Sequence, residues 1–90
     1  MAAIEFDPKK NAINIAKHGI SFERAGELIV SFAHFDSRAD YGEERVLAYG
    51  YIEGLAYCLC YVERDGKKRA ISLRRAHEKE LKQHVKNKQN

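Results

Sequence analysis

The strongest constraint on the fold of this chain is a run of ten residues, 55–64, that lies between two turn signals. Glu53-Gly54 precedes the run and Asp65-Gly66 follows it, and such pairs favour tight turns between antiparallel strands. The alternating side chains on both sides of the run are largely apolar: Leu55, Tyr57, Leu59 and Tyr61 on one side, Ala56, Cys58, Cys60 and Val62 on the other. A strand of this kind is typical of the centre of a sheet that is covered on both faces.

Three further strands are expected beside this run. Segments rich in β-branched and aromatic residues occur at residues 32–36 and 45–51, and residues 68–75 follow the second turn. Consecutive strands that are joined by short turns pair in antiparallel fashion. The sequence therefore predicts a four-stranded antiparallel meander.

The first helix is predicted over residues 8–18. Asp7 before Pro8 is typical of a helix start, and Gly19 is placed to adopt the left-handed conformation that ends a helix. Ser21 is the expected cap of a second helix, which would bury a stripe of apolar side chains: Phe22, Ala25, Leu28 and Ile29. A last helix, from about residue 77 to 87, carries lysines that either keep it solvated or contact phosphates.

These elements predict an α+β fold in which an N-terminal helical hairpin packs on the four-stranded antiparallel sheet, with a helix at the C-terminal end. The 90 residues, with 44% hydrophobic content, fit a single domain over residues 1–90. Because the chain has no stretch of about 18 apolar residues and no N-terminal secretion signal, we expect a cytoplasmic protein without a membrane segment. Cys58 and Cys60 have no further cysteine to complete a metal or redox site, which favours core thiols.

Positive charge is concentrated at one end of the chain. Residues 64–90 contain ten Lys and Arg against three acidic residues, a net charge of +7, whereas residues 1–63 have a net charge of −4. Such a division creates a positive face that can hold a polyanion in a salt-dependent manner. The alternative is a solvated helix with a lysine-rich tail.

Several signatures of catalysis are absent from the sequence. It contains no glycine-rich phosphate loop, nucleophile elbow, HExxH segment or paired-cysteine motif, which argues against enzymes with small-molecule cofactors. RNA cleavage without metal requires a base for the 2′-OH, cations for the charge on the phosphorane and an acid for the leaving 5′ oxygen. Histidine, lysine, arginine and tyrosine can supply all three functions.

The expected strand pairing limits which basic residues can share a site. Antiparallel pairing places Arg64 beside residues 67–69 and away from Arg74, unless the sheet is strongly twisted. Consecutive Arg74 and Arg75 point to opposite faces of a regular strand. His18 is either an acid or base or a cap for the first helix. Four tyrosines either stack on RNA bases or belong to the core: Tyr49, Tyr51, Tyr57 and Tyr61.

The order of several segments closely resembles the BrnT family, the ribonuclease toxins of bacterial type II toxin–antitoxin modules. The resemblance extends from residue 5 to about residue 84. The segments that carry it are Phe6-Asp7-Pro8-Lys9-Lys10, Asn14, Lys17-His18-Gly19-Ile20-Ser21-Phe22-Glu23, Gly42-Glu43-Glu44-Arg45, Tyr61 with Arg64, and Ile71-Ser72-Leu73-Arg74-Arg75-Ala76 with Glu80.

This resemblance implies a RelE-like fold and a toxin that cleaves RNA, including mRNA free or on the ribosome, and thereby stops translation and growth. It also implies a cognate BrnA-like antitoxin that holds two toxins in a 2:2 heterotetramer and binds promoter DNA through its own domain. No cofactor or metal is expected. The alternative is a non-catalytic regulatory module that binds nucleic acid or the ribosome.

Six catalytic candidates follow from the resemblance, residue by residue: Lys17, His18, Arg64, Arg74, Arg75 and Glu80. Lys17 or His18 would transfer protons, whereas Arg64 and Arg74 would stabilise phosphate charge. Glu80 would be either a salt-bridge partner or a catalytic group. The basic C-terminal third adds six candidates for RNA binding: Lys67, Lys68, Arg69, Lys79, Lys82 and His84.

Three positions depart from the family pattern. Phe6 replaces a usual tryptophan and Leu73 a usual alanine, and both are interpreted as packing changes. His84 stands where a tyrosine is common. Since a C-terminal tyrosine could carry a proton in this fold, His84 either replaces it or marks a changed site.

Overall fold

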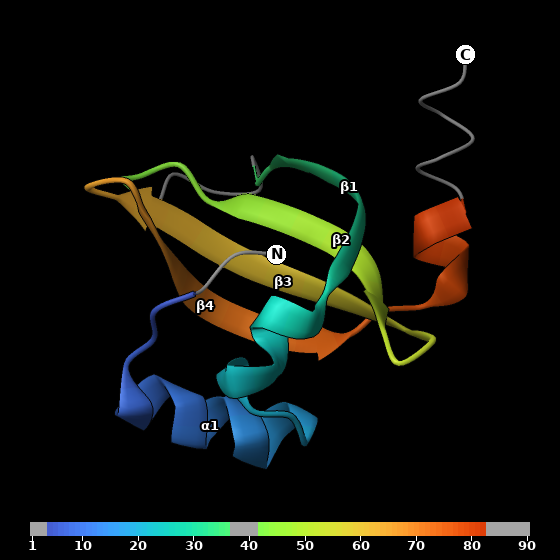
Figure 1. Ribbon diagram of the computed structural model, residues 1–90, viewed down its shortest axis with the longest axis horizontal. Coiled ribbons are helices and arrows are strands. Elements are labelled where there is room, and N and C mark those ends of the chain that lie inside the picture. Colours follow the sequence, from blue (N-terminus) through green and yellow to red (C-terminus); the bar gives the residue numbers. More distant parts are fainter. Residues whose placement is uncertain (1–3, 37–41, 83–90) are drawn as a thin grey trace.

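The run that was expected to form the central strand is β3, and the sheet has the predicted antiparallel meander (Figure 1). The computed structural model describes residues 4–36 and 42–82. β3 lies between β2 and β4, and β1 forms the far edge next to β2. The strands are β1 (Ile29–Phe35), β2 (Val46–Ile52), β3 (Leu55–Arg64) and β4 (Lys67–Arg75).

The first helix, α1 (Pro8–His18), has the predicted bounds and both predicted caps. The side chain of Asp7 accepts a hydrogen bond from the backbone N–H of Lys9 at 2.9 Å. At the other end Gly19 adopts a φ of 71°, and its N–H donates to the carbonyl of Ile15 at 2.8 Å. These bonds satisfy backbone groups that would otherwise lack partners at the helix ends.

The prediction of a helical hairpin is wrong for its second helix. This segment forms the short 3-10 helix η1 (Phe22–Glu27). Phe22 and Ala25 in this helix and Leu28 directly after it recur every three residues, which is the period of a 3-10 helix, and all three are at most 1% exposed. The fourth residue of the expected stripe, Ile29, is 74% exposed and begins β1. β1 therefore starts three residues earlier than predicted, and a bulge at Ser31 interrupts its register with β2.

A short helix follows β4 over residues 78–82. This confirms the start of the predicted last helix, and Leu81 anchors it because it is only 2% exposed. The remainder of that predicted helix, with His84, lies outside the described residues. No helix among residues 4–36 and 42–82 is long and apolar enough to cross a membrane.

Both faces of the sheet are covered, as the apolar pattern of β3 predicted. One core cluster joins the sheet to the N-terminal helical segments: Ile20, Phe22, Ala25, Leu28, Ala48, Ile52, Tyr57, Leu59, Tyr61, Ala70 and Leu73. A second cluster includes Leu81 of the last helix: Phe32, Leu47, Tyr49, Ala56, Cys58, Cys60, Ala76 and Leu81. We call the side of the second cluster the Leu81 face.

The helix α1 is fixed to the edge of the sheet by one buried amide. The Nδ2 group of Asn14 donates to the carbonyls of Leu73 at 2.9 Å and Ile20 at 3.0 Å, and its Oδ1 accepts from the N–H of Leu73 at 3.1 Å. Earlier in β4, the backbone of Glu5 bonds in the same way to Lys68 and Ala70. Asn14 thus acts as a short substitute for a neighbouring strand, and it sets the position of α1 along β4.

Candidate functional site

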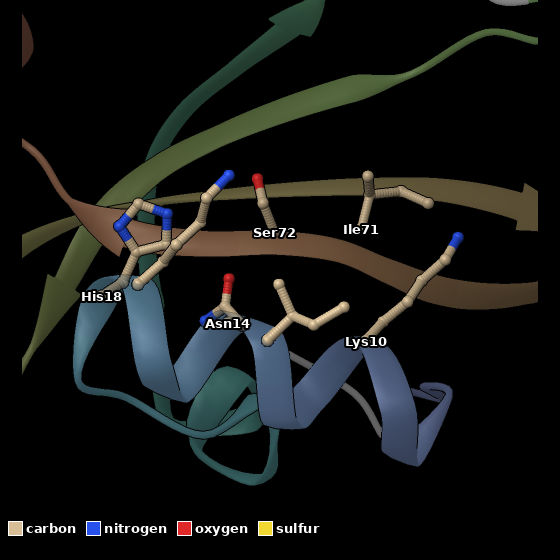
Figure 2. A pocket seen from close by; sticks show the side chains of 7 residues that line it. Lys10, Asn14, His18, Ile71 and Ser72 are labelled. Carbon is tan, nitrogen blue, oxygen red and sulfur yellow. The ribbon is translucent and has the colours of Figure 1, made fainter.

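A pocket of about 140 Å³ lies between α1 and β4. Figure 2 shows the side chains of Lys10, Asn14 and His18 rising from α1 toward Ser72 and Ile71 of β4. Two further residues of α1 complete the lining, Ile13 and Lys17. Three basic side chains and one hydroxyl group therefore surround this pocket.

Two of these residues, Lys10 and Ser72, were not among the sequence candidates. Lys10, Asn14 and Lys17 recur at intervals of four and three residues, so they share one face of α1. That spacing was a usable signal for Lys10. Ser72 depends instead on an irregularity of β4: the register with β3 shifts between Ala70 and Ser72, where Ile71 is the extra residue. Such bulges redirect side chains, and the sequence pattern did not reveal this one.

Arg74 and Glu80 meet on the Leu81 face. The Nη2 atom of Arg74 lies 3.7 Å from Oε2 of Glu80, and its Nη1 donates to the carbonyl of Arg75 at 3.1 Å. Both side chains are 35% exposed. Within the described part of the chain, Oε2 of Glu80 is buried and accepts no hydrogen bond. The two side chains are thus paired by charge at 3.7 Å, without a hydrogen bond to Oε2 of Glu80.

Tyr49 lies close to this pair on the same face. Burial raises the pKa of its hydroxyl to about 12, and Cys58 and Glu80 add to the shift while Arg74 opposes it. The sheet register explains the proximity, because Tyr49 is directly opposite Cys58 and Cys58 is directly opposite Arg74. A phenol of this kind stays protonated and can act as a hydrogen-bond donor at neutral pH.

Arg75 points to the other face, as strand alternation requires. Its guanidinium lies over the ring of Tyr57, 5.5 Å from the centroid, and its Nε donates to the carbonyl of Ala56 at 3.3 Å. Tyr57 belongs to the core cluster of the N-terminal helical segments. Arg75 therefore packs against the end of β3 and does not join Arg74.

Arg64 lies far from Arg74. It is opposite Lys67, and six residues of β3 separate it from Cys58, the partner of Arg74. At about 3.3 Å per residue this is roughly 20 Å. Arg64 forms a bidentate ion pair with Glu43 at 2.8–3.1 Å, which lowers the pKa of that carboxyl. The structure therefore does not bring the two arginines into one site.

The other basic candidates lie around the β3–β4 turn and on the last helix. Lys67 is 3.5 Å from Glu5, and Lys68 lies over the ring of Tyr61, 5.4 Å from its centroid. Arg69 pairs with the backbone of Glu5 in an isolated bridge. On the last helix Lys79 is exposed, and Lys82 is 3.9 Å from Glu78.

No group of three or more His, Cys, Asp or Glu side chains that could hold a metal ion is found in residues 4–36 and 42–82. Cys58 and Cys60 are buried, and neither forms a disulfide. This agrees with the interpretation of the two cysteines as core residues.

Comparison with known families identifies most of the chain. Residues 6–80 match the family model described as "Ribonuclease toxin, BrnT, of type II toxin-antitoxin system". The matched range contains α1, all four strands and Glu80. No curated protein and no solved structure gives a significant match.

The raised pKa of Tyr49 predicts a loss of stability at high pH. The unfolded chain releases this proton near pH 10, whereas the folded protein retains it until about pH 12, so the free energy of unfolding must fall across that interval. Below pH 10 the contribution is fully present. Urea unfolding of wild type and Tyr49→Phe at pH 9 and pH 11 measures this effect. The wild type should lose more stability than the variant, and equal losses would contradict the assignment.

Proposed function

Because the chain belongs to the BrnT family of ribonuclease toxins of type II toxin–antitoxin systems, we propose that it cleaves RNA without a metal ion. In the proposed reaction a ribose 2′-OH attacks the adjacent phosphate. In this reaction the bond between O2′ and phosphorus forms and the bond between phosphorus and O5′ breaks. A base takes the 2′-OH proton, an acid gives a proton to O5′, and the products carry a 2′,3′-cyclic phosphate and a 5′-OH. Cations stabilise the charge on the phosphorane.

The observation that carries this proposal is the pocket in which Lys17 and His18 lie near Ser72, two residues before Arg74. Two residues of a strand span about 7 Å, so an RNA strand that crosses this end of β4 reaches both positions. Ser72 and Arg74 are opposite Cys60 and Cys58 of the second core cluster, so the two residues face the same side of the sheet.

In this account Lys17 and His18 transfer the protons, and Lys10 with the Ser72 hydroxyl holds the phosphate beside them. Arg74 approaches the same phosphodiester from the Leu81 face and stabilises its charge. Glu80 positions Arg74, because its carboxylate is the side-chain partner of that guanidinium at 3.7 Å. Arg75 is a positioning residue that fixes the end of β4 on Tyr57.

We assign Arg64 a different function from the one that the resemblance implied. Its distance from Arg74 along β3 and its pairing with Glu43 support a contact with RNA phosphates outside the reacting centre. The basic residues near it and on the last helix would act in the same way: Lys67, Lys68, Arg69, Lys79 and Lys82. Contacts of this kind weaken as salt concentration rises.

Two matched arginine variants test the proposed site. Arg74→Ala removes stabilisation of the transition state, and we expect it to lower the cleavage rate by roughly 10²–10³-fold. Arg64→Ala also removes an arginine that is paired with a glutamate, yet it should lower the rate by less than about tenfold and should weaken RNA binding instead. Cleavage of a short RNA is measured in EDTA, with an oligonucleotide that is 2′-deoxy at the scissile position as the control.

The result that would contradict the proposal is cleavage of the 2′-deoxy oligonucleotide, or a loss of cleavage in EDTA. Equal defects in the two arginine variants would contradict the location of the site. RNA binding without any scission would favour the alternative, a non-catalytic module that binds nucleic acid or the ribosome.

A type II toxin has a protein antitoxin. We propose that a BrnA-like antitoxin holds two copies of this chain in a 2:2 heterotetramer and binds promoter DNA through its own domain. β1 supports a docking site, because it is an edge strand that exposes three apolar side chains: Ile29, Val30 and Phe35. Light scattering of the co-purified complex should give the mass of two copies of each chain, and the mass of a 1:1 complex would contradict this assembly.

A further inference from the structure

Three parallel aromatic rings lie on the Leu81 face, where β1 meets β2. Phe32 and Tyr49 are stacked with centroids 4.8 Å apart and an interplanar angle of 14°. The ring of His34 is parallel to both, at 6.3 Å from Phe32 and 5.9 Å from Tyr49, with interplanar angles of 7° and 17°. Phe32 and Tyr49 are each 6% exposed, whereas His34 is exposed. The stack thus has two buried members and one that solvent reaches.

The histidine ring is held in place. Its Nδ1 atom lies 3.1 Å from the carbonyl oxygen of Phe35. Since a carbonyl oxygen only accepts hydrogen bonds, Nδ1 carries the proton in this contact. With this hydrogen bond and two parallel neighbours, the exposed ring of His34 is ordered before any ligand arrives, which reduces the entropy lost on binding.

The stack is continuous with the proposed catalytic residues. Phe32 pairs with Tyr49, Tyr49 with Cys58, and Cys58 with Arg74, so these four positions form one row across the sheet. Three strand spacings of about 4.8 Å make the row roughly 14 Å wide. His34 occupies the next row of the same face. A short single-stranded RNA segment that contacts Arg74 can therefore reach the stack.

We propose that His34, supported by Phe32 and Tyr49, is a stacking site for an unpaired nucleobase of the RNA substrate. This inference rests on the proposed function, because it assigns a second contact to the strand that Arg74 binds. Every nucleobase offers an aromatic face, and RNA-binding proteins stack unpaired bases on Phe, Tyr, Trp and His side chains. A cationic group beside an ordered aromatic surface is the combination that single-stranded nucleic acid requires.

Two substitutions separate stacking from the chemistry of the imidazole. His34→Phe keeps an aromatic ring, whereas His34→Leu keeps apolar bulk without one. Binding is measured with a short RNA that is 2′-deoxy at the scissile position, so that it binds without being cut. We expect His34→Leu to raise the Kd by roughly 5–50-fold and His34→Phe to change it less than about threefold. Equal weakening by both variants, or no weakening by either, would overturn the proposal.

An abasic nucleotide in the RNA supplies a second test, in which the substrate is changed as well as the protein. Moved along the oligonucleotide, it should weaken binding to the wild-type protein most strongly at one position. At that position it should cause no further weakening in His34→Leu, since the two changes remove the same contact. Additive losses at every position would contradict the stacking site.

The outcomes also separate this inference from the proposed function. If the wild-type protein fails to cleave RNA but His34→Leu still weakens binding more than His34→Phe, the catalytic proposal fails and the base site stands. If cleavage and its dependence on Arg74 are intact while His34 variants bind normally, the base site alone is wrong.

Discussion

The contact on which the rest of the structure depends is the pairing of the Asn14 amide with the backbone of Leu73. β4 is an edge strand, and its outward N–H and C=O groups need partners. One side chain of α1 supplies both, and it also binds the carbonyl of Ile20 where the chain leaves α1. Because Lys17 and His18 follow three and four residues later on the same helix, this amide determines which part of β4 they approach.

The same contact brings residues of α1 and β4 together at the candidate site. Leu73 points into the core, while Ser72 lines the pocket beside α1 and Arg74 lies with Glu80 on the Leu81 face. In the proposed site, Lys17 and His18 come from α1 beside the edge of β4, whereas Arg74 comes from β4 itself. Because Ser72 and Arg74 are opposite Cys60 and Cys58 of the second core cluster, a substrate that crosses the Leu81 face at this end of β4 can contact both residues.

Local rules were sufficient for much of this architecture. The caps of α1, the turns at Gly54 and Gly66 and the central position of β3 all follow from short-range preferences, and the structure confirms them. The prediction of a second α-helix was wrong because a repeat of three residues also fits the first turns of an α-helix. The placement of Ser72 and His34 was not predicted, because a bulge and a cross-strand ring stack depend on pairing between distant segments. The separation of Arg64 from Arg74 was foreseeable from pairing, whereas the match to a family motif suggested a shared site.

Amide hydrogen exchange at Leu73 tests the central claim most directly. The N–H of Leu73 faces outward from an edge strand and donates its hydrogen bond to the Asn14 side chain at 3.1 Å, where a neighbouring strand would otherwise accept it. The account predicts slow exchange at Leu73 in the wild type. In Asn14→Ala it predicts exchange at least about tenfold faster at Leu73 while the amides of β3 remain protected. Equal protection of the Leu73 amide in both proteins would show that something other than Asn14 holds α1 to β4, and would contradict the account.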